Sequence, residues 1–405
     1  MLKKAGKKFL SVVLATAMVV SSITVYGASV KVPEDRVLTS VKEYSIAPGI
    51  KEKHITTVDK DGNNQVQAYM AEVDLKTSSI GMMAGYKNYD KTGKWGMQTV
   101  RDQAKAAEKA TGKTIVAAIN GDYFDMGTGQ PWGSLVMGGD IVQTQNGYPY
   151  FAIMKDGTAD CREAYEPLDD VVEAIGSPFF LVKDGKALEE LAADPYAMPR
   201  CAVGIKADGS VIIYEADGRQ APKSCGQPIY ETAKQMEAMG CVEALYLDGG
   251  GSATFASRTE GTDSLEVKNS PSDGTERKVS SSLFIYSDAK ANGEFDHATI
   301  SPLEEVYTPG STVQFEAKGV DSAGSKADLP KDATFVLKDD SFGTIDGTTG
   351  QFVSNGTEGT VEVQLKSGDK VVGSTTIEVR KPDSITFVND EVNLGFEEET
   401  DLGLT

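Results

Sequence analysis

Histidine is the scarcest of the residue types that carry chemistry in this chain. Its 405 residues include only two histidines, His54 in a predicted strand and His297 in a polar segment. Neither position suits a Ser-His-Asp or Cys-His catalytic pair in a core. The chain also lacks an H-E-x-x-H sequence and a phosphate-binding loop that ends in Gly-Lys-Ser or Gly-Lys-Thr. These absences argue against histidine-dependent hydrolases, zinc proteases of that type and P-loop enzymes.

Cysteine is also rare, and its spacing excludes one class of metal site. The four cysteines contain no C-x-x-C pair, which argues against a structural zinc site. Four cysteines are too few to make a disulfide scaffold of a chain this long. The spacing leaves open whether any pair is bridged. The residues are Cys161, Cys201, Cys225 and Cys241.

Positive charge is in deficit. The chain has 40 lysines and arginines against 60 acidic residues, for a formal net charge of −20 at pH 7. Because residues 1–27 hold four lysines and no acid, their removal would leave −24. A field of this sign disfavours nucleic acid as a partner. An anionic substrate requires local arginines and backbone amides that overcome the repulsion.

Long apolar runs are absent except near the N-terminus. Four lysines precede an apolar run over residues 9–25, and small residues follow near Gly27. This pattern predicts a secretory signal peptide over residues 1–27. As a membrane anchor the run is short and interrupted by serine and threonine. We therefore expect a secreted, extracellular protein with no stable membrane span after cleavage, and association with a cell wall is a further hypothesis.

The remaining sequence predicts an α+β catalytic domain followed by a small all-β module. Hairpin signals recur along the first part, and two helices are expected over residues 99–110 and 229–239, so the sheets should be mostly antiparallel or mixed. The later short strands are typical of an immunoglobulin-like β-sandwich and resemble bacterial modules appended to secreted enzymes, with a role in spacing or adhesion. The expected boundaries are a lead-in at 28–45 with ordered structure from about Ile46, the catalytic domain at 46–287, a linker at 288–297, the sandwich at 298–381, and a truncated further β domain or tail at 382–405.

Two predicted strands are followed directly by polar residues. The predicted strand that begins at Val242 ends at Asp248, and Gly249, Gly250, Gly251 and Ser252 follow. Glycine lets the backbone approach a ligand closely, and successive amides can hold an anion. The alternative is a glycine-rich turn with an aspartate cap. A second strand, 114–119, continues into Asn120-Gly121-Asp122-Tyr123-Phe124, which an ordinary Asn-Gly turn would also explain.

Carboxylates, arginines and amides are the residues of a glycoside-cleaving site or of a calcium site. Three stretches bear on this choice: I-N-G-D-Y-F at 119–124, P-R-C-A-V-G at 199–204 and L-D-G-G-G-S at 247–252. In this order they resemble the phosphodiester glycosidase family. The resemblance covers about residues 56–286, including Arg277. It departs at Cys201, where the family often has threonine or another small residue.

The resemblance implies hydrolysis of a sugar-1-phosphodiester, of the N-acetylglucosamine-1-phosphodiester kind, to free sugar and a phosphomonoester. Because a phosphate leaving group is weakly basic, neutralising its charge should matter more than protonating it. Arg200 and Arg277 are the candidates for that contact, since a guanidinium binds phosphate oxygens in a bidentate manner. The alternative for each arginine is an ion pair.

Asp248 is the first candidate for the catalytic carboxylate, as nucleophile, base or electrostatic stabiliser. Asp122 is its expected partner, as acid/base or as a clamp on a sugar hydroxyl beside Asn120. Tyr123 and Trp132 are candidates for stacking on the sugar, whereas Phe124 better suits the core. The three glycine amides and Ser252 are expected to bind phosphate or sugar hydroxyls.

Two other functions fit the same residues. A non-catalytic protein that binds cell-wall or cell-surface glycan would keep the groove and the β-module. Calcium held by Asn120, Asp122 and Asp248 would be structural; otherwise we assign no cofactor and no metal ligand. The sequence leaves the oligomeric state open.

Overall fold

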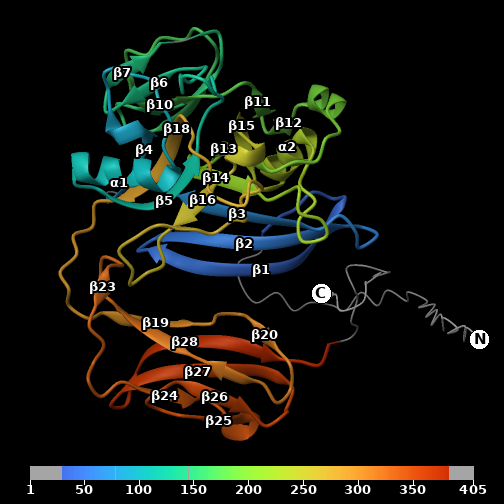
Figure 1. Cartoon of the computed structure of the whole chain (residues 1–405), viewed down its shortest axis with the longest axis vertical. Coiled ribbons are helices and arrows are strands. Elements are labelled where there is room, and N and C mark those ends of the chain that lie inside the picture. The colour runs from blue at the N-terminus through green and yellow to red at the C-terminus, as the bar shows by residue number, and fades with distance from the viewer. Residues whose placement is uncertain (1–29, 78, 145, 383–405) are drawn as a thin grey trace, which may run out of the picture.

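The computed structural model describes residues 30–382 except 78 and 145. The predicted signal peptide and all but the first residue of the predicted C-terminal tail lie outside the described residues. Figure 1 shows a larger N-terminal part above a smaller part made of strands. In the described residues the larger part contains three antiparallel sheets and two α-helices, α1 (Val100–Thr111) and α2 (Ile229–Ala238).

The largest sheet has eight strands, and every neighbouring pair is antiparallel. Their order is β1 (Arg36–Ala47), β2 (Ile50–Asp59), β3 (Val66–Val73), β14 (Val211–Ala216), β13 (Arg200–Lys206), β15 (Cys241–Leu247), β11 (Phe180–Lys183) and β12 (Lys186–Ala187). The expectation that order begins near Ile46 was wrong, because β1 pairs with β2 from Arg36 onward. Most side chains of β1 are only partly buried, so the strand keeps many polar residues and lacks a clear apolar pattern.

Two five-stranded sheets complete the larger part. One runs in the order β17 (Glu266–Val267), β16 (Phe255–Ser257), β5 (Thr114–Asn120), β18 (Ser281–Ser287) and β4 (Ile80–Tyr86). The other runs in the order β7 (Asp140–Gln143), β6 (Leu135–Met137), β10 (Val171–Gly176), β8 (Tyr150–Met154) and β9 (Ala159–Arg162). Strand β10 lies between β6 and β8 and pairs with both.

The apolar faces stack these elements in layers. The main core lies between the eight-stranded sheet and the sheet that contains β5, with Val203, Leu247 and Phe255 among its members. On the outer face of the eight-stranded sheet, α2 packs through Ala233 and Met236. Helix α1 packs on β5 and β18, on the face of their sheet that points away from the main core. Thr99 caps α1, since its hydroxyl accepts from the amide of Asp102.

The smaller part has its own core, which includes Phe315, Phe352 and Val363. Its three sheets are β19 (His297–Ser301), β22 (Glu316–Val320) and β23 (Lys326–Ala327); β20 (Val306–Tyr307), β28 (Lys370–Val379), β27 (Gly359–Ser367) and β24 (Thr334–Leu337); and β21 (Thr312–Gln314), β26 (Gln351–Ser354) and β25 (Gly343–Ile345). These strands match the expected all-β module. Its immunoglobulin-like character stays a prediction.

Candidate active site

The three sequence motifs meet at one edge of the stacked sheets. The start of β13 lies beside the end of β15, where Cys201 pairs with Leu247. The loop after β15 then joins the loop after β5, because the amide of Asp248 donates to the carbonyl of Gly121 at 2.8 Å. Main-chain hydrogen bonds therefore bring together segments that are far apart in the sequence.

Asn120 holds this junction. Its Nδ2 donates to the carbonyl oxygen of Asp248 at 2.6 Å, and its Oδ1 accepts from the amide of Thr254 at 2.9 Å. The Cys201 thiol donates to the same Oδ1 at 3.2 Å, so the departure from threonine keeps a hydrogen-bond donor. Asn120 is 0% exposed. Its side chain is committed to positioning the Asp248 loop, and the geometry gives it no direct route to the substrate that we expected it to bind.

Asp122 is a buried carboxyl group whose two oxygens differ in their hydrogen bonding. It is 2% exposed, and Oδ2 accepts from the amide of Gly133 at 2.5 Å. Oδ1 has no hydrogen-bond partner among the described residues. Burial raises the pKa of Asp122 to about 7, and the charge of Asp248 acts in the same direction. Near neutral pH, Oδ1 can therefore carry a proton.

Asp248 is more accessible than Asp122, since its side chain is half-buried. Burial raises its pKa to about 6, while the Ser252 hydroxyl and the Arg277 guanidinium act in the opposite direction. Asp248 is therefore mostly ionised at a pH at which Asp122 still holds its proton. Two carboxyl groups whose environments separate their pKa values in this way can divide acid and base roles.

The glycines after Asp248 allow close approach rather than offering three open amides. Gly250 has a φ of +60°, and its amide donates to the carbonyl of Pro199 at 2.9 Å, so that amide is not available to a ligand. A Cβ at position 249 would lie 2.6 Å from the same carbonyl oxygen. A Cβ at position 251 would lie 1.9 Å from Nη2 of Arg277. The loop thus packs tightly against β13 on one side and Arg277 on the other.

The two predicted phosphate arginines have different surroundings. Arg277 is half-buried, forms an ion pair with Asp273 at 2.7 Å and donates to Oγ of the buried Ser252 at 3.4 Å, so its guanidinium lies at the glycine loop. Arg200 is 1% exposed, and one of its nitrogens donates to Oη of Tyr246 at 3.0 Å. Its other nitrogens donate to the carbonyls of Gln227 at 2.9 Å and Tyr196 at 2.6 Å. Arg200 is therefore built into the wall behind Tyr246 and does not face the site as we expected.

Aromatic side chains lie beside Asp122. Trp132 is 42% exposed and meets the half-buried Tyr123 edge to face, with ring centroids 5.3 Å apart. Tyr148 stacks on Trp132 at 5.9 Å. The residue after Trp132 is Gly133, which bonds Asp122, so this surface is fixed relative to the carboxyl group. Phe124 is buried in the core beneath α1, as expected.

Sequence reasoning missed an arginine and a second pair of acids. Arg219 follows β14, and a Cβ on Gly250 would lie 3.2 Å from its Nη2. Glu215 and Asp217 are fully buried at the end of the same strand. Burial raises the pKa of Glu215 well above its usual range and that of Asp217 to about 6. The available signal was an acid inside an otherwise apolar strand, followed by Gly218-Arg219 before the next helix.

Within the described part of the chain, no group of three or more His, Cys, Asp and Glu side chains is arranged to hold a metal ion. Two of the three expected calcium ligands, Asp122 and Asp248, do come together. The third, Asn120, has its amide oxygen occupied by two donors. The geometry therefore offers calcium two carboxylates rather than the expected set.

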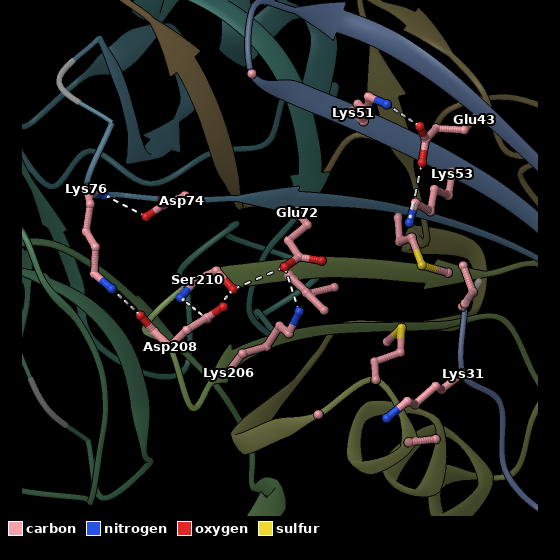
Figure 2. A pocket seen from close by; sticks show the side chains of 17 residues that line it. Lys31, Glu43, Lys51, Lys53, Glu72, Asp74, Lys76, Lys206, Asp208 and Ser210 are labelled. Atoms are coloured by element: carbon pink, nitrogen blue, oxygen red, sulfur yellow. Dashed lines mark hydrogen bonds and ion pairs between the residues drawn. The ribbon is translucent and has the colours of Figure 1, made fainter. Parts of the chain in front are cut away.

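A cavity of about 710 Å³ lies elsewhere, at the far end of β13 from Arg200 (Figure 2). Lys206 there pairs with Glu72 at 2.7 Å, and Lys51 pairs with Glu43. Nζ of Lys76 donates to the carbonyl of Asp208 at 2.6 Å. Because most charges around the cavity are paired and no motif residue lines it, the carboxyl pair is the better candidate site.

Comparisons with known proteins point to the same residues. The family model described as phosphodiester glycosidase matches residues 113–286, which contain all three motifs. This stretch matches the phosphodiester glycosidase family. The family resemblance predicted from the motifs is confirmed.

Relatives support this family at low identity. The chain is 29% identical over 161 residues to N-acetylglucosamine-1-phosphodiester alpha-N-acetylglucosaminidase of Mus musculus, covering 34% of this chain and 31% of that protein. It is 26% identical over 285 residues to the prophage-derived uncharacterized protein YomE of Bacillus subtilis, covering 64% and 42%. The chain thus spans less than half the length of these relatives. The zebrafish N-acetylglucosamine-1-phosphodiester alpha-N-acetylglucosaminidase catalytic domain aligns with a TM-score of 0.46 and 23% identity, over 62% of this chain and 88% of that one.

Proposed function

We propose that this chain is a secreted glycosidase that hydrolyses a sugar-1-phosphodiester to free sugar and a phosphomonoester. The observation that carries the proposal is the meeting of Asp122 and Asp248, which differ in pKa and lie on two family motifs joined by main-chain hydrogen bonds. The substrate class follows from the relatives' names and from the glycosidase family. N-Acetylglucosamine is accordingly the first sugar to test.

The roles follow from proton positions and exposure. Asp122 donates its proton from Oδ1 to the phosphate oxygen as the bond to the anomeric carbon breaks. Asp248, mostly ionised, stabilises positive charge at that carbon or acts as nucleophile or base toward water. Water supplies the hydroxyl of the released sugar. Trp132 and Tyr123 offer an apolar face to the sugar ring, and Arg277 lies where the phosphate charge must be neutralised.

Secretion rests on the predicted signal peptide. Among the described residues, no helix is both long enough and apolar enough to span a membrane. A sugar-phosphodiester polymer or glycan outside the cell is therefore the class of natural substrate that we propose.

The test is release of free N-acetylglucosamine from an α-N-acetylglucosamine-1-phosphodiester. We expect the wild type to release the sugar. In Asp248→Asn the rate of release should fall at least about 100-fold, because the negative charge that stabilises the anomeric carbon is lost. Asp140→Asn, at an exposed position on β7, is the matched control and should keep full activity. Release that is unchanged in Asp248→Asn would contradict its role. If the wild type releases no sugar from a panel of sugar phosphodiesters, the proposed function is contradicted and a glycan-binding protein is favoured. If a chelator abolishes sugar release, the site holds calcium.

A further inference from the structure

We infer that Arg219 binds the phosphate group of the substrate and makes the site selective for a phosphorylated leaving group. This inference rests on the function proposed above and deepens it. No sequence motif pointed to Arg219, and it lies on a different loop from Arg277.

Arg219 is fixed in an unusual backbone conformation. Its φ of +62° is in the left-handed region, which residues other than glycine seldom adopt. The adjoining residues hold that conformation, because Gln220 and Ser224 exchange backbone hydrogen bonds of 3.0 Å. Nε2 of Gln220 also donates to the carbonyl of Ser270 at 2.8 Å. The side chain of Arg219 therefore leaves an anchored loop in a set direction.

That direction is toward the glycines after Asp248. A Cβ on Gly250 would lie 3.2 Å from Nη2 and 3.5 Å from Nη1 of Arg219. On the next residue, a Cβ at Gly251 would meet Nη2 of Arg277. Two guanidinium groups from separate loops thus flank two successive glycines, Gly250 and Gly251, which are two and three residues past the candidate catalytic carboxylate Asp248.

No ion pair with a described residue neutralises the charge of Arg219. Among the described arginines, Arg219 is the exposed one that forms no ion pair; Arg36 and Arg200, the others without an ion pair, are buried and bonded to carbonyl oxygens. The hydrogen-bond partner found for its guanidinium is the sulfur of Met198 at 3.1 Å. This is notable in a chain with 20 more acidic than basic residues. An exposed guanidinium without a carboxylate is available to a ligand anion.

Arg277 by itself cannot make the site attractive to an anion. Its charge is paired with Asp273, and Asp122 and Asp248 add negative charge when ionised. Arg219 therefore supplies the uncompensated positive charge that a phosphodiester needs near these carboxyl groups. The buried Oδ1 of Asp122, which has no hydrogen-bond partner in the described part of the chain, independently indicates that the site is built for a polar ligand.

The test compares a charged with a neutral leaving group. The variants are Arg219→Gln, Arg219→Lys and the control Arg101→Gln, an exposed arginine on α1 paired with Glu276. We expect Arg219→Gln to lower kcat/KM for methyl α-N-acetylglucosamine-1-phosphate about 10- to 100-fold, the loss of one charge-assisted contact, and to change kcat/KM for 4-nitrophenyl α-N-acetylglucosaminide less than about 3-fold. Arg219→Lys should recover part of the loss. Equal losses on both substrates, or a variant that behaves like Arg101→Gln, would overturn the inference.

Binding separates this inference from the proposed function. Titration calorimetry of the methyl phosphodiester with the Asp248→Asn protein reports affinity without turnover, and adding Arg219→Gln should weaken it about 10-fold or more. If the wild type releases no sugar but Arg219→Gln still weakens binding, the proposed function fails and the inference holds. If release is normal and the affinity is unchanged, only the inference fails.

Discussion

Asp122 and Asp248 have the same side chain and differ in what surrounds it. Asp122 is enclosed by Gly133 and Gly176, where an added Cβ would lie 3.1 and 2.5 Å from its Oδ2. Asp248 keeps contact with solvent and has a hydroxyl and a guanidinium nearby. Burial disfavours the charged form, so the more enclosed carboxyl group has the higher pKa.

This difference predicts a bell-shaped pH dependence. The kcat/KM for a sugar phosphodiester should rise as Asp248 ionises near pH 6 and fall as Asp122 loses its proton near pH 7, with the two apparent values belonging to the pair. Asp122→Asn should lower kcat/KM about 100-fold and remove the alkaline limb, because no proton is left to lose. Initial rates from pH 4 to 9 measure this, and an alkaline limb that persists in Asp122→Asn would assign it to another group.

On the eight-stranded sheet, neighbouring strands place Glu215 in the interior. Glu215 pairs with Tyr69 on β3 and with Cys201 on β13, and residues opposite each other in a sheet share one face. That face packs against the main core, where neither carboxyl oxygen of Glu215 accepts a hydrogen bond from a described residue. Its pKa is raised by burial first and by the negative charge of Asp217 second. Glu215 is therefore neutral in the folded protein.

A neutral Glu215 makes the stability of the fold depend on pH. A carboxyl group whose pKa is raised by folding binds more protons in the folded state, so its contribution to stability is largest below the unfolded pKa of about 4.3 and is lost as pH rises through the folded value. Glu215→Gln mimics the neutral form. We expect its free energy of unfolding to exceed that of the wild type by about 1 kcal/mol or more at pH 8, since one pKa unit corresponds to about 1.4 kcal/mol, with the difference shrinking toward pH 4.5.

Urea unfolding at pH 4.5, 6 and 8 measures that difference, with Glu190→Gln at an exposed position as the control. The control should show no such trend with pH. A Glu215→Gln protein that is less stable than the wild type at pH 8 would show that the group is charged in the fold.

At the scale of the whole molecule, the two parts shown in Figure 1 have separate cores. Among the described residues, the hydrogen bonds and ion pairs between the two parts include Lys42 with Glu305, His297 with Glu260 at 3.4 Å, and the amide of Gly261 with the carbonyl of Gly324 at 3.1 Å. An ion pair at the surface contributes little to stability, and Lys42–Glu305 is of this kind. The cores should therefore unfold as two units.

Phe352→Ala tests this separation. Phe352 is fully buried on β26, and truncation of a buried phenylalanine costs about 3–5 kcal/mol. Calorimetry should show two transitions in the wild type and a lower temperature for only one of them in the variant, with sugar release at 25 °C unchanged. A single transition that shifts as a whole would mean that the parts unfold together.

Local pattern was enough to predict much of the fold. The recurring hairpin signals agree with pairs such as β2–β3 and β13–β14, and the helix expected over residues 99–110 matches α1 within one residue at each end. These features depend on neighbours in the sequence. Strand β1 was missed because a half-covered strand keeps many polar side chains, and the short strands β9, β10 and β16 gave no periodic signal.

The sequence by itself determined which chemistry is available and which loops carry it: with two histidines, the carboxylates of Asp122 and Asp248 remain, at the ends of apolar strands. Only the tertiary structure decided what each side chain faces. Arg200 and Asn120 form hydrogen bonds inside the protein, whereas Arg219 is exposed and forms no ion pair with a described carboxylate. The physical reason is that burial and hydrogen-bond partners arise from strands distant in the chain, and these contacts determine a charge's pKa and its availability to a ligand.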